Sequence, residues 1–460
     1  MVSSRIRTRA MSARWNVRAT VCLLLLSAGA CSQGGGSTAI GSGGSSASIA
    51  GAAGTFGGGS AGSSGSATGP GGAGAGAGGS GATSAGGSST MSAGSAGTTS
   101  TGGAGSGGSA GAAGGTSAGG GASDVVDASK MVAQMGFGTN IGNTLENTTA
   151  WETGWGQPLI SQAYINGMAS RGIKTVRVPV AWDTYATNGV IDATKLARVK
   201  EVVGWIEAAG MYSIVNIHWD GGWIDNESNA NKYQLTSDVK TKFASYWTQI
   251  ATGFSGVGNK LIFEGLNEEG HFYVNGNSSG AVDYAALNQL NQLFVTTVRA
   301  QSGFNKARAL LIAGFTTDID LTCVDAFTIP SDPAGSGKLF LSLHYYTPYT
   351  FTGLDTVESW GSPATTWGTD SEKTTLQGLF SKLATFSGKK QIPVIIGEFG
   401  VTLGVNYVRD SASRTLWMES VAKAAFSHGM VPVLWDTGSE IKRTDGSFSS
   451  EFQTVMNDTK

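Results

Sequence analysis

The chain has 460 residues, of which 13% are charged, with 30 basic against 32 acidic side chains. This balance gives no basic signal for nucleic acid, so no nucleic-acid partner is expected. Just over half of the 71 glycines lie in the first 121 residues, so the averages mix two kinds of sequence that must be considered separately.

Residues 1–30 are predicted to be a signal peptide. Arginines without any acidic residue precede the apolar run VCLLLLSAGA. The apolar core is about ten residues long, too short for the ~20 that a membrane-spanning helix needs. Cys31 then follows Ala28, Gly29 and Ala30, which resembles a bacterial lipobox, although that motif usually has Leu at the position of Ala28. Export is therefore expected, with two alternatives open: an outer-membrane or cell-surface lipoprotein lipidated at Cys31, or simple secretion.

Residues 31–123 are almost wholly Gly, Ser, Ala and Thr and are predicted to form a disordered linker. Such a composition offers too little apolar surface to offset the entropy lost on folding. A Gly/Ser coil of this length has an r.m.s. span of about 50 Å, enough to hold a globular domain clear of a membrane.

Residues 124–460 have the composition of one globular domain, with Cys323 as its lone cysteine, too few for a disulfide framework. Helical patterns at 193–210 and 284–303 each end on Gly, as expected at a helix C-terminus. Short apolar runs alternate with such patterns, and eight strands alternating with helices predict an α/β fold, the (β/α)8 TIM barrel. The runs are 137–143, 175–180, 212–218, 261–267, 309–315, 339–346, 393–399 and 431–437.

Three carboxylates crowd the end of the fourth run, LIFEGLNEEG, and one is expected to do chemistry. The C-terminal strand ends of a barrel carry its active site. Strand alternation places Glu264 and Glu268 on one face, with Glu268 at the open end. Glu264 then reads as an interior hydrogen-bonded carboxylate and Glu269 as a loop residue. The same alternation puts Glu398 at the mouth, beyond Val394 and Ile396, and a facing carboxylate pair suggests glycosidic bond cleavage.

The motifs FEGLNEEG and VIIGEFG resemble the acid/base and nucleophile motifs of glycoside hydrolase family 5, the cellulase-like retaining (β/α)8 glycosidases. The resemblance extends over about 135–440 through IGNTLEN, VRVPVAW, GMYSIVNIHWDGGW, LSLHYYTPYTF and VLWDTG. It is strongest to a subfamily of endo-β-1,4-glucanases and xyloglucanases with a G-N-T-L-[DE] motif. We therefore expect a hydrolase that acts on a polysaccharide and needs no metal or organic cofactor. The protein is expected to be a monomer.

The resemblance also implies roles for individual residues. Glu268 matches the general acid/base and Glu398 the nucleophile. Asn267 matches the group that binds the sugar 2-hydroxyl, and Arg177 the cation that lowers the pKa of the nucleophile. Further substrate-site matches are His218, His344, Tyr346 and Trp435. Among other aromatic side chains near the predicted mouth, Trp223 is the one expected to stack on a sugar.

Two departures from the family pattern and several alternatives bear on function. Glu269 stands where the family usually has Pro, and its charge is expected to raise the pKa of Glu268. HWDGGW lacks a second His found in many relatives. Substrate preference therefore stays open among cellulose, mixed-linkage glucan, xyloglucan and, for a β-mannanase, mannan. A non-catalytic surface glycan-binding protein is the alternative from another class. A barrel metallohydrolase is disfavoured, because the four histidines lack zinc-binding spacing.

Overall fold

The structure is a computed structural model that describes residues 126–225 and 232–459. The predicted signal peptide, Cys31 and the linker 31–123 lie outside the described residues. None of the helices in the described part of the chain is both long and apolar enough to cross a membrane.

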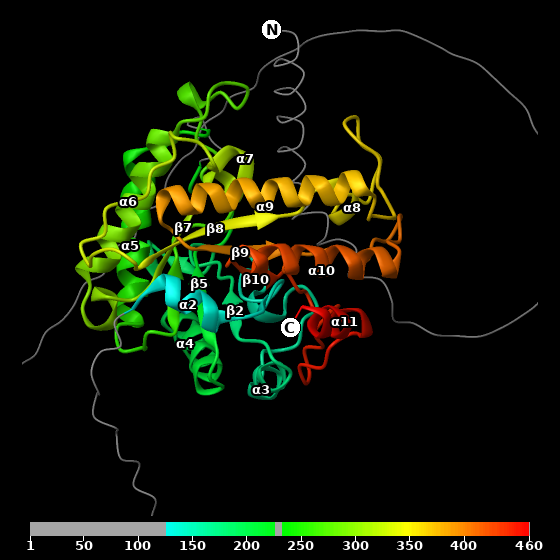
Figure 1. The fold of residues 1–460 in the computed structure, drawn as a ribbon. Helices are drawn as coiled ribbons and strands as arrows, with labels where there is room; N and C mark the ends of the chain where they lie inside the picture. The colour runs from blue at the N-terminus through cyan, green and yellow to red at the C-terminus, as the bar shows by residue number, and fades with distance from the viewer. Residues whose placement is uncertain (1–125, 226–231, 460) are drawn as a thin grey trace, which may run out of the picture. The chain divides into compact units, whose positions relative to one another are not determined.

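Eight parallel strands close into a barrel in the order β1-β10-β9-β8-β7-β6-β5-β2, which confirms the predicted (β/α)8 fold (Figure 1). Every strand falls inside a predicted run, but most end two or three residues earlier, because the polar residues after them belong to loops. The strands are β1 Gly138–Asn140, β2 Thr175–Val178, β5 Tyr212–Asn216, β6 Leu261–Glu264, β7 Leu310–Ala313, β8 Leu339–Tyr345, β9 Val394–Phe399 and β10 Val431–Leu434. A separate antiparallel hairpin, β3 Ala186–Thr187 and β4 Val190–Ile191, was not predicted.

Helices surround the barrel and connect its strands. The α-helices are α2 Ala128–Met135, α3 Gln162–Ser170, α4 Ala193–Ala208, α5 Ser237–Gly253, α6 Tyr284–Ala300, α7 Ile319–Thr322, α8 Tyr349–Thr352, α9 Asp370–Lys390, α10 Ser411–Ser427 and α11 Ser450–Asp458. Short 3-10 turns are η1 Trp151–Thr153, η2 Val274–Gly276, η3 Gly303–Lys306 and η4 Phe315–Thr317. The predicted C-terminal glycine is right for α4, where Gly210 follows the cap with φ 83°. It is wrong for α6, whose cap Gln301 has an extended backbone.

Two apolar layers hold the barrel. The larger one lies between strands and helices and includes Leu343, Val394 and Ile396. The smaller one fills the barrel interior near the N-terminal ends of the strands, where Met131 and Met135 of α2 pack with residues such as Ile395. With that end filled, the site has to form at the opposite, C-terminal end.

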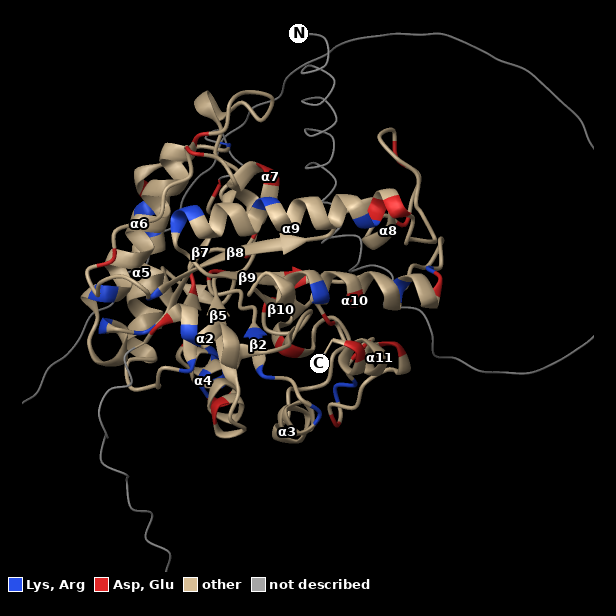
Figure 2. Ribbon diagram, viewed as in Figure 1, with Lys and Arg blue, Asp and Glu red and all other residues tan. Residues whose placement is uncertain are grey.

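The charged residues of α9 match the dipole of the helix, and its ribbon in Figure 2 is red near one end and blue at the other. Asp370 and Glu372 lie in its first turn, and Lys389 and Lys390 in its last. Acidic groups at a helix N-terminus and basic groups at its C-terminus are stabilising. A capping box between Thr369 and Glu372 fixes where this helix begins.

Strand β9 carries a bulge, which corrects the predicted faces. Leu343 pairs with Ile396, but the next residue of β8, His344, pairs with Glu398, so Gly397 is an extra residue. Val394 and Ile396 therefore face the helices, contrary to the expectation that they share a face with Glu398. The bulge turns Glu398 into the barrel, and Phe399 returns to the outer layer.

Candidate active site

Arg177 of β2 is the centre of a buried polar network at the C-terminal end of the barrel. Its side chain is fully buried and donates to Glu264 at 2.6 Å and to Glu398 at 2.8 Å. It also donates to Asn140 at 2.9 Å and Asn267 at 2.8 Å. Although burial opposes its charge, Glu264 and Glu398 raise the pKa of Arg177, which stays protonated.

Glu264 is the interior carboxylate that was predicted. Besides the bond from Arg177, it accepts a hydrogen bond from Ser342 of β8 at 2.7 Å. Sequence reasoning missed two partners in this network, Asn140 and Ser342. Asn140 donates to the carbonyls of Gly397 at 2.9 Å and Leu434 at 3.1 Å, and so links β1 to β9 and β10. The available signal was a polar residue inside an otherwise apolar run.

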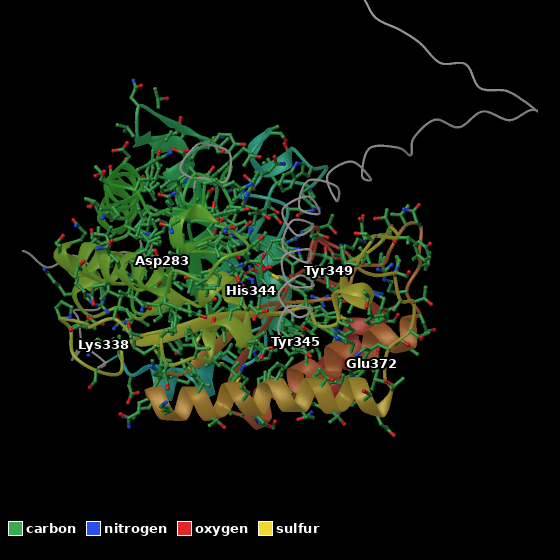
Figure 3. The ribbon with its side chains drawn as sticks, turned by 90° about the horizontal axis from the view of Figure 1, so that it is seen from above. Asp283, Lys338, His344, Tyr345, Tyr349 and Glu372 are labelled. Atoms are coloured by element: carbon green, nitrogen blue, oxygen red, sulfur yellow. The ribbon has the colours of Figure 1, made fainter. Side chains whose placement is uncertain are left out.

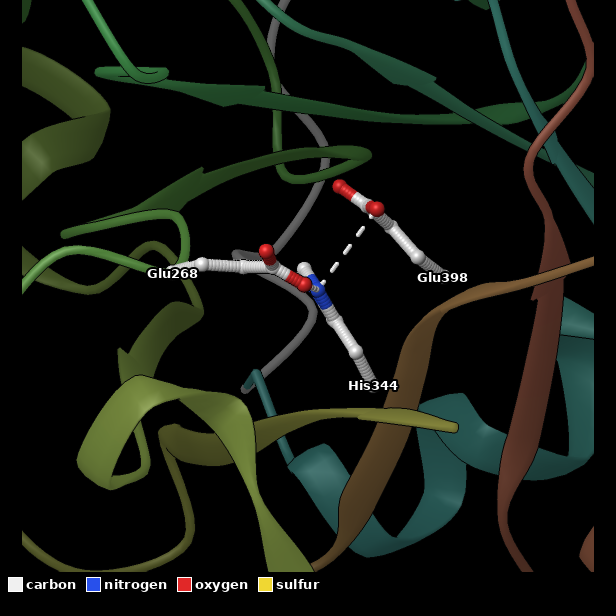
Figure 4. Close-up of side chains that lie close together, drawn as sticks. All are labelled: Glu268, His344 and Glu398. Carbon is white, nitrogen blue, oxygen red and sulfur yellow. Dashed lines mark hydrogen bonds and ion pairs between the residues drawn. The ribbon is translucent and has the colours of Figure 1, made fainter. Parts of the chain in front are cut away.

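Glu268, His344 and Glu398 lie together at the mouth (Figure 4). His344 Nδ1 lies 2.9 Å from Glu268 Oε1 and 3.6 Å from Glu398 Oε2. One ligand-capable atom from each of the three lies within 4.8 Å of the others. β8 begins directly after Lys338 and contains His344. In Figure 3, Lys338 lies near the edge of the molecule and His344 near its middle. Glu268, after β6, and Glu398, on β9, therefore share the imidazole of His344, which lies on β8 between these two strands.

Opposing effects act on the pKa of Glu398. Burial raises the pKa of this carboxyl, while His344 and Arg177 lower it and the negative Glu268 raises it. The Tyr346 hydroxyl, which donates to Glu398 Oε2 at 3.0 Å, lowers it too. Arg177 thus acts in the expected direction, but burial outweighs it.

Glu268 lies at the barrel mouth as predicted, but it is a loop residue there and not part of the strand. β6 ends at Glu264, and Leu266 packs in the outer layer, so strand alternation does not extend to Glu268. The loop after β6 instead positions it, with Asn267 held by Arg177 on one side and Glu268 by His344 on the other. The predicted residue is at the mouth, but for a different geometric reason.

Trp435 follows β10 and stacks on His218, with ring centroids 5.7 Å apart and an interplanar angle of 8°. Burial lowers the pKa of His218 well below its ordinary value, and Arg177 adds to this, so the ring is neutral. A Cβ on Gly142 would lie 3.1 Å from the Trp435 ring, so the opening motif IGNTLEN passes closely beside it. Glu146 of that motif accepts the amide N–H groups of Asn143 and Thr144 and shapes the turn.

Trp223 lies outside the network around Arg177. It packs edge to face on Tyr246 of α5, at a centroid distance of 5.8 Å, with the Lys242 ammonium 4.4 Å from its ring centroid. Four other aromatic side chains are buried and cannot stack on a sugar from solvent: Trp151, Trp182, Tyr345 and Trp367.

Glu269 is a loop residue, as expected, but its side chain is buried. It is only 3% exposed, and its Oε2 accepts the backbone N–H of Asn267 at 3.0 Å. Burial raises the pKa of Glu269 well above its ordinary value, and the nearby charges of Asp225 and Glu268 raise it further. Burial therefore disfavours the negative charge that Glu269 was expected to place beside Glu268.

Comparison with known proteins agrees with this geometry. Residues 134–440 match the family model described as cellulase, glycosyl hydrolase family 5. The chain belongs to glycoside hydrolase family 5. An endoglucanase A of Paenibacillus barcinonensis is 35% identical over 68% of this chain and 82% of its own length. A xyloglucan-specific endo-β-1,4-glucanase of Bacteroides ovatus is 34% identical over 69% of this chain and 66% of its own length.

Solved structures of the family share the same barrel. A broad-specificity endoglucanase from an uncultured bovine rumen ciliate superposes with a TM-score of 0.64 at 30% identity, covering 72% of this chain and 98% of that one. In this glycoside hydrolase, the side chains of Glu268, His344 and Glu398 are better suited to proton transfer than to holding a metal ion. Glu398 already has a guanidinium cation at 2.8 Å, which neutralises its charge.

Proposed function

We propose that the protein is a retaining endo-glycosidase that cleaves β-1,4-glucan linkages in plant polysaccharide. The observation that carries the proposal is the carboxylate pair, Glu268 and Glu398, with atoms within 4.8 Å of each other. Retaining glycosidases hold their carboxyl groups about 5–5.5 Å apart, whereas inverting ones leave roughly 6.5–9.5 Å for a water. The separation supports a double displacement.

In this mechanism, Glu268 gives its proton to the leaving glycosidic oxygen while Glu398 attacks the anomeric carbon. Water then hydrolyses the glycosyl-enzyme, with Glu268 acting as base. Arg177 and the Tyr346 hydroxyl hold the two oxygens of Glu398, one each, so that the nucleophile keeps a fixed orientation. Trp435, stacked on the neutral His218, forms the platform beneath the sugar at the cleavage point.

The substrate proposal is a β-1,4-glucan: cellulose, mixed-linkage glucan or xyloglucan. The relatives named above are endoglucanases and a xyloglucan-specific enzyme, which favours a glucan backbone over mannan. The intact carboxylate pair opposes a merely glycan-binding role. Trp223 stays a proposed sugar contact, on the grounds of its sequence alone.

We further propose that the enzyme acts outside the cell as a monomer. The support for export is the predicted signal peptide in residues 1–30, with either lipidation of Cys31 or plain secretion. A lipid would be its membrane attachment, with the linker 31–123 as tether. Radiolabelled palmitate incorporation, lost in Cys31→Ser, separates the two.

The catalytic proposal is tested by reducing-sugar release from carboxymethylcellulose, barley β-glucan, xyloglucan, mannan and xylan. Activity on a β-1,4-glucan that Glu398→Gln abolishes supports the pair and identifies the substrate. A folded protein inactive on all five would instead favour the binding-protein alternative.

A further inference from the structure

The loop after β6 contains a buried acid to which the reaction assigns no role. Glu269 directly follows Glu268, and its Oε2 accepts the N–H of Asn267 at 3.0 Å. Asn267 is in turn bonded to Arg177 through its side chain at 2.8 Å. Asn267 thus accepts a hydrogen bond from Arg177 with its side chain and donates one to Glu269 with its backbone N–H.

Asp225 is a second buried acid, whose charge acts on Glu269 and which pairs with His271. Asp225 is 2% exposed, and its Oδ2 lies 2.8 Å from His271 Nδ1. Within the described part of the chain, Asp225 Oδ1 and Glu269 Oε1 are both buried oxygens without a hydrogen-bond partner. Two buried, ionised carboxylates in this arrangement would be costly, and a proton on one of them removes most of that cost.

We propose that Glu269 is a positioning residue: as a neutral carboxylic acid it holds the backbone of Asn267 and thereby fixes Glu268 for proton transfer. Its Oε2 accepts the backbone bond, so the proton belongs on its other oxygen, Oε1, which has no hydrogen-bond partner within the described residues. The family pattern has Pro at this position, a residue that restricts the backbone by its ring. Here the buried acid supplies the restraint through a hydrogen bond.

The physical consequence concerns placement rather than substrate affinity. A displacement of about 1 Å in a catalytic group can cost on the order of 10²-fold in rate. Losing the Asn267 bond should therefore lower kcat while KM changes little. A neutral Glu269 also leaves the pKa of Glu268 unaffected by a second charge, so replacing it by an uncharged group of the same shape should not move the pH profile.

The test rests on the proposed glycosidase function and uses the full chain with Glu269→Ala, Glu269→Gln and a control, Glu207→Gln. Glu207 is another carboxyl whose pKa is raised by burial, but it lies on α4 near Lys260 and Arg308, at the far end of the barrel. On the glucan that the wild type cleaves fastest, the Glu269→Ala substitution should lower kcat about 10²-fold. Gln, which keeps the acceptor and supplies a donor, should restore kcat to within a few-fold and leave the alkaline limb of kcat/KM unmoved.

Two results would overturn the proposal. If Glu269 carries a charge, removing it lowers the pKa of Glu268, and the Gln variant shifts the alkaline limb to lower pH. If Glu269 only fills space, Gln and Ala behave alike, or Ala keeps the kcat of the wild type.

Thermal unfolding gives a readout that does not depend on activity. A carboxyl whose pKa is raised in the folded state loses its stabilising contribution as pH rises from its unfolded pKa through its folded pKa. The Gln variant should therefore gain in Tm relative to wild type as pH rises above the unfolded pKa of glutamate, about 4.3, while Glu269→Ala should melt lower throughout. A constant difference between Gln and wild type would contradict a proton on Glu269 even if no substrate were found.

Discussion

Replacing Arg177 by methionine should separate its structural role from its chemical one. The guanidinium is fully buried between Glu264 at 2.6 Å and Glu398 at 2.8 Å. Removing one partner of a buried ion pair costs about 3–5 kcal/mol, because it leaves an uncompensated charge. With an unfolding entropy of ~2.1 cal/mol/K per residue over roughly 330 residues, this corresponds to a fall in Tm of about 4–7 °C.

Activity should fall for a different reason. Arg177 lowers the pKa of Glu398, which burial already raises, so its loss raises that pKa further. A nucleophile must be ionised, so the acid limb of kcat/KM moves to higher pH. With a charge-assisted hydrogen bond also lost from the reacting carboxylate, we expect kcat to fall on the order of 10³-fold. The assay is a pH–rate profile on the best glucan substrate beside thermal unfolding.

Two further variants complete the experiment. Arg177→Met with Glu264→Gln removes one orphaned charge and should recover part of the Tm but not the activity. Arg308→Met is the matched control, since Arg308 is also fully buried but bonds the carbonyls of Phe254 at 3.0 Å and Leu261 at 2.9 Å, far from the mouth. It should lose stability without moving the acid limb. An Arg177→Met enzyme whose acid limb stays in place would refute the electrostatic reasoning.

Three other outcomes follow from the site. Tyr346→Phe removes the 3.0 Å hydrogen bond to Glu398, worth about 1.5–3 kcal/mol to a charged acceptor, so kcat should fall at least roughly tenfold and the acid limb should move to higher pH. Trp435→Ala removes the ring stacked on His218, and a loss of about 1.5–3 kcal/mol of apolar burial should lower kcat/KM roughly 10–100-fold in steady-state assays, with the acid limb unchanged. Dialysis against EDTA should leave the rate unchanged, because a guanidinium already balances Glu398; a loss restored by a divalent cation would contradict this.

Much of the fold could be predicted because its signals are local. Apolar runs bounded by polar residues marked all eight barrel strands, and a 3.6-residue periodicity marked helices such as α4 and α6. Strand ends were less predictable, since a chain leaving a barrel keeps apolar residues such as Leu266 that pack outside it. The hairpin of β3 and β4 is only two residues per strand, too short for any periodic pattern to reveal.

The site was predictable in its residues but not in its connections. A polar residue is easy to notice within or directly after an apolar run of the sequence. The site residues with such positions are Glu268, Glu398, His344 and Arg177. The bonds among them join residues from four different strands or loops, and no local pattern encodes such contacts. Glu269 shows the cost of this, because its pKa is raised well above its ordinary value by burial and by the charge of Asp225, a residue distant in sequence.

The bulge in β9 shows why correct residues can follow from an incorrect geometric argument. Strict alternation from Ile395, an interior residue, would place Gly397 inside and Glu398 against the helices. The extra residue lets both Gly397 and Glu398 face the barrel, and a Cβ on Gly397 would lie 3.1 Å from His344 Nε2 and from Ser342 Oγ. Glycine at 397 therefore makes room for the imidazole, while the bulge aims the carboxylate at Arg177. The nucleophile reaches the mouth by a break in the strand's period, a device that the regular pattern of its apolar neighbours conceals.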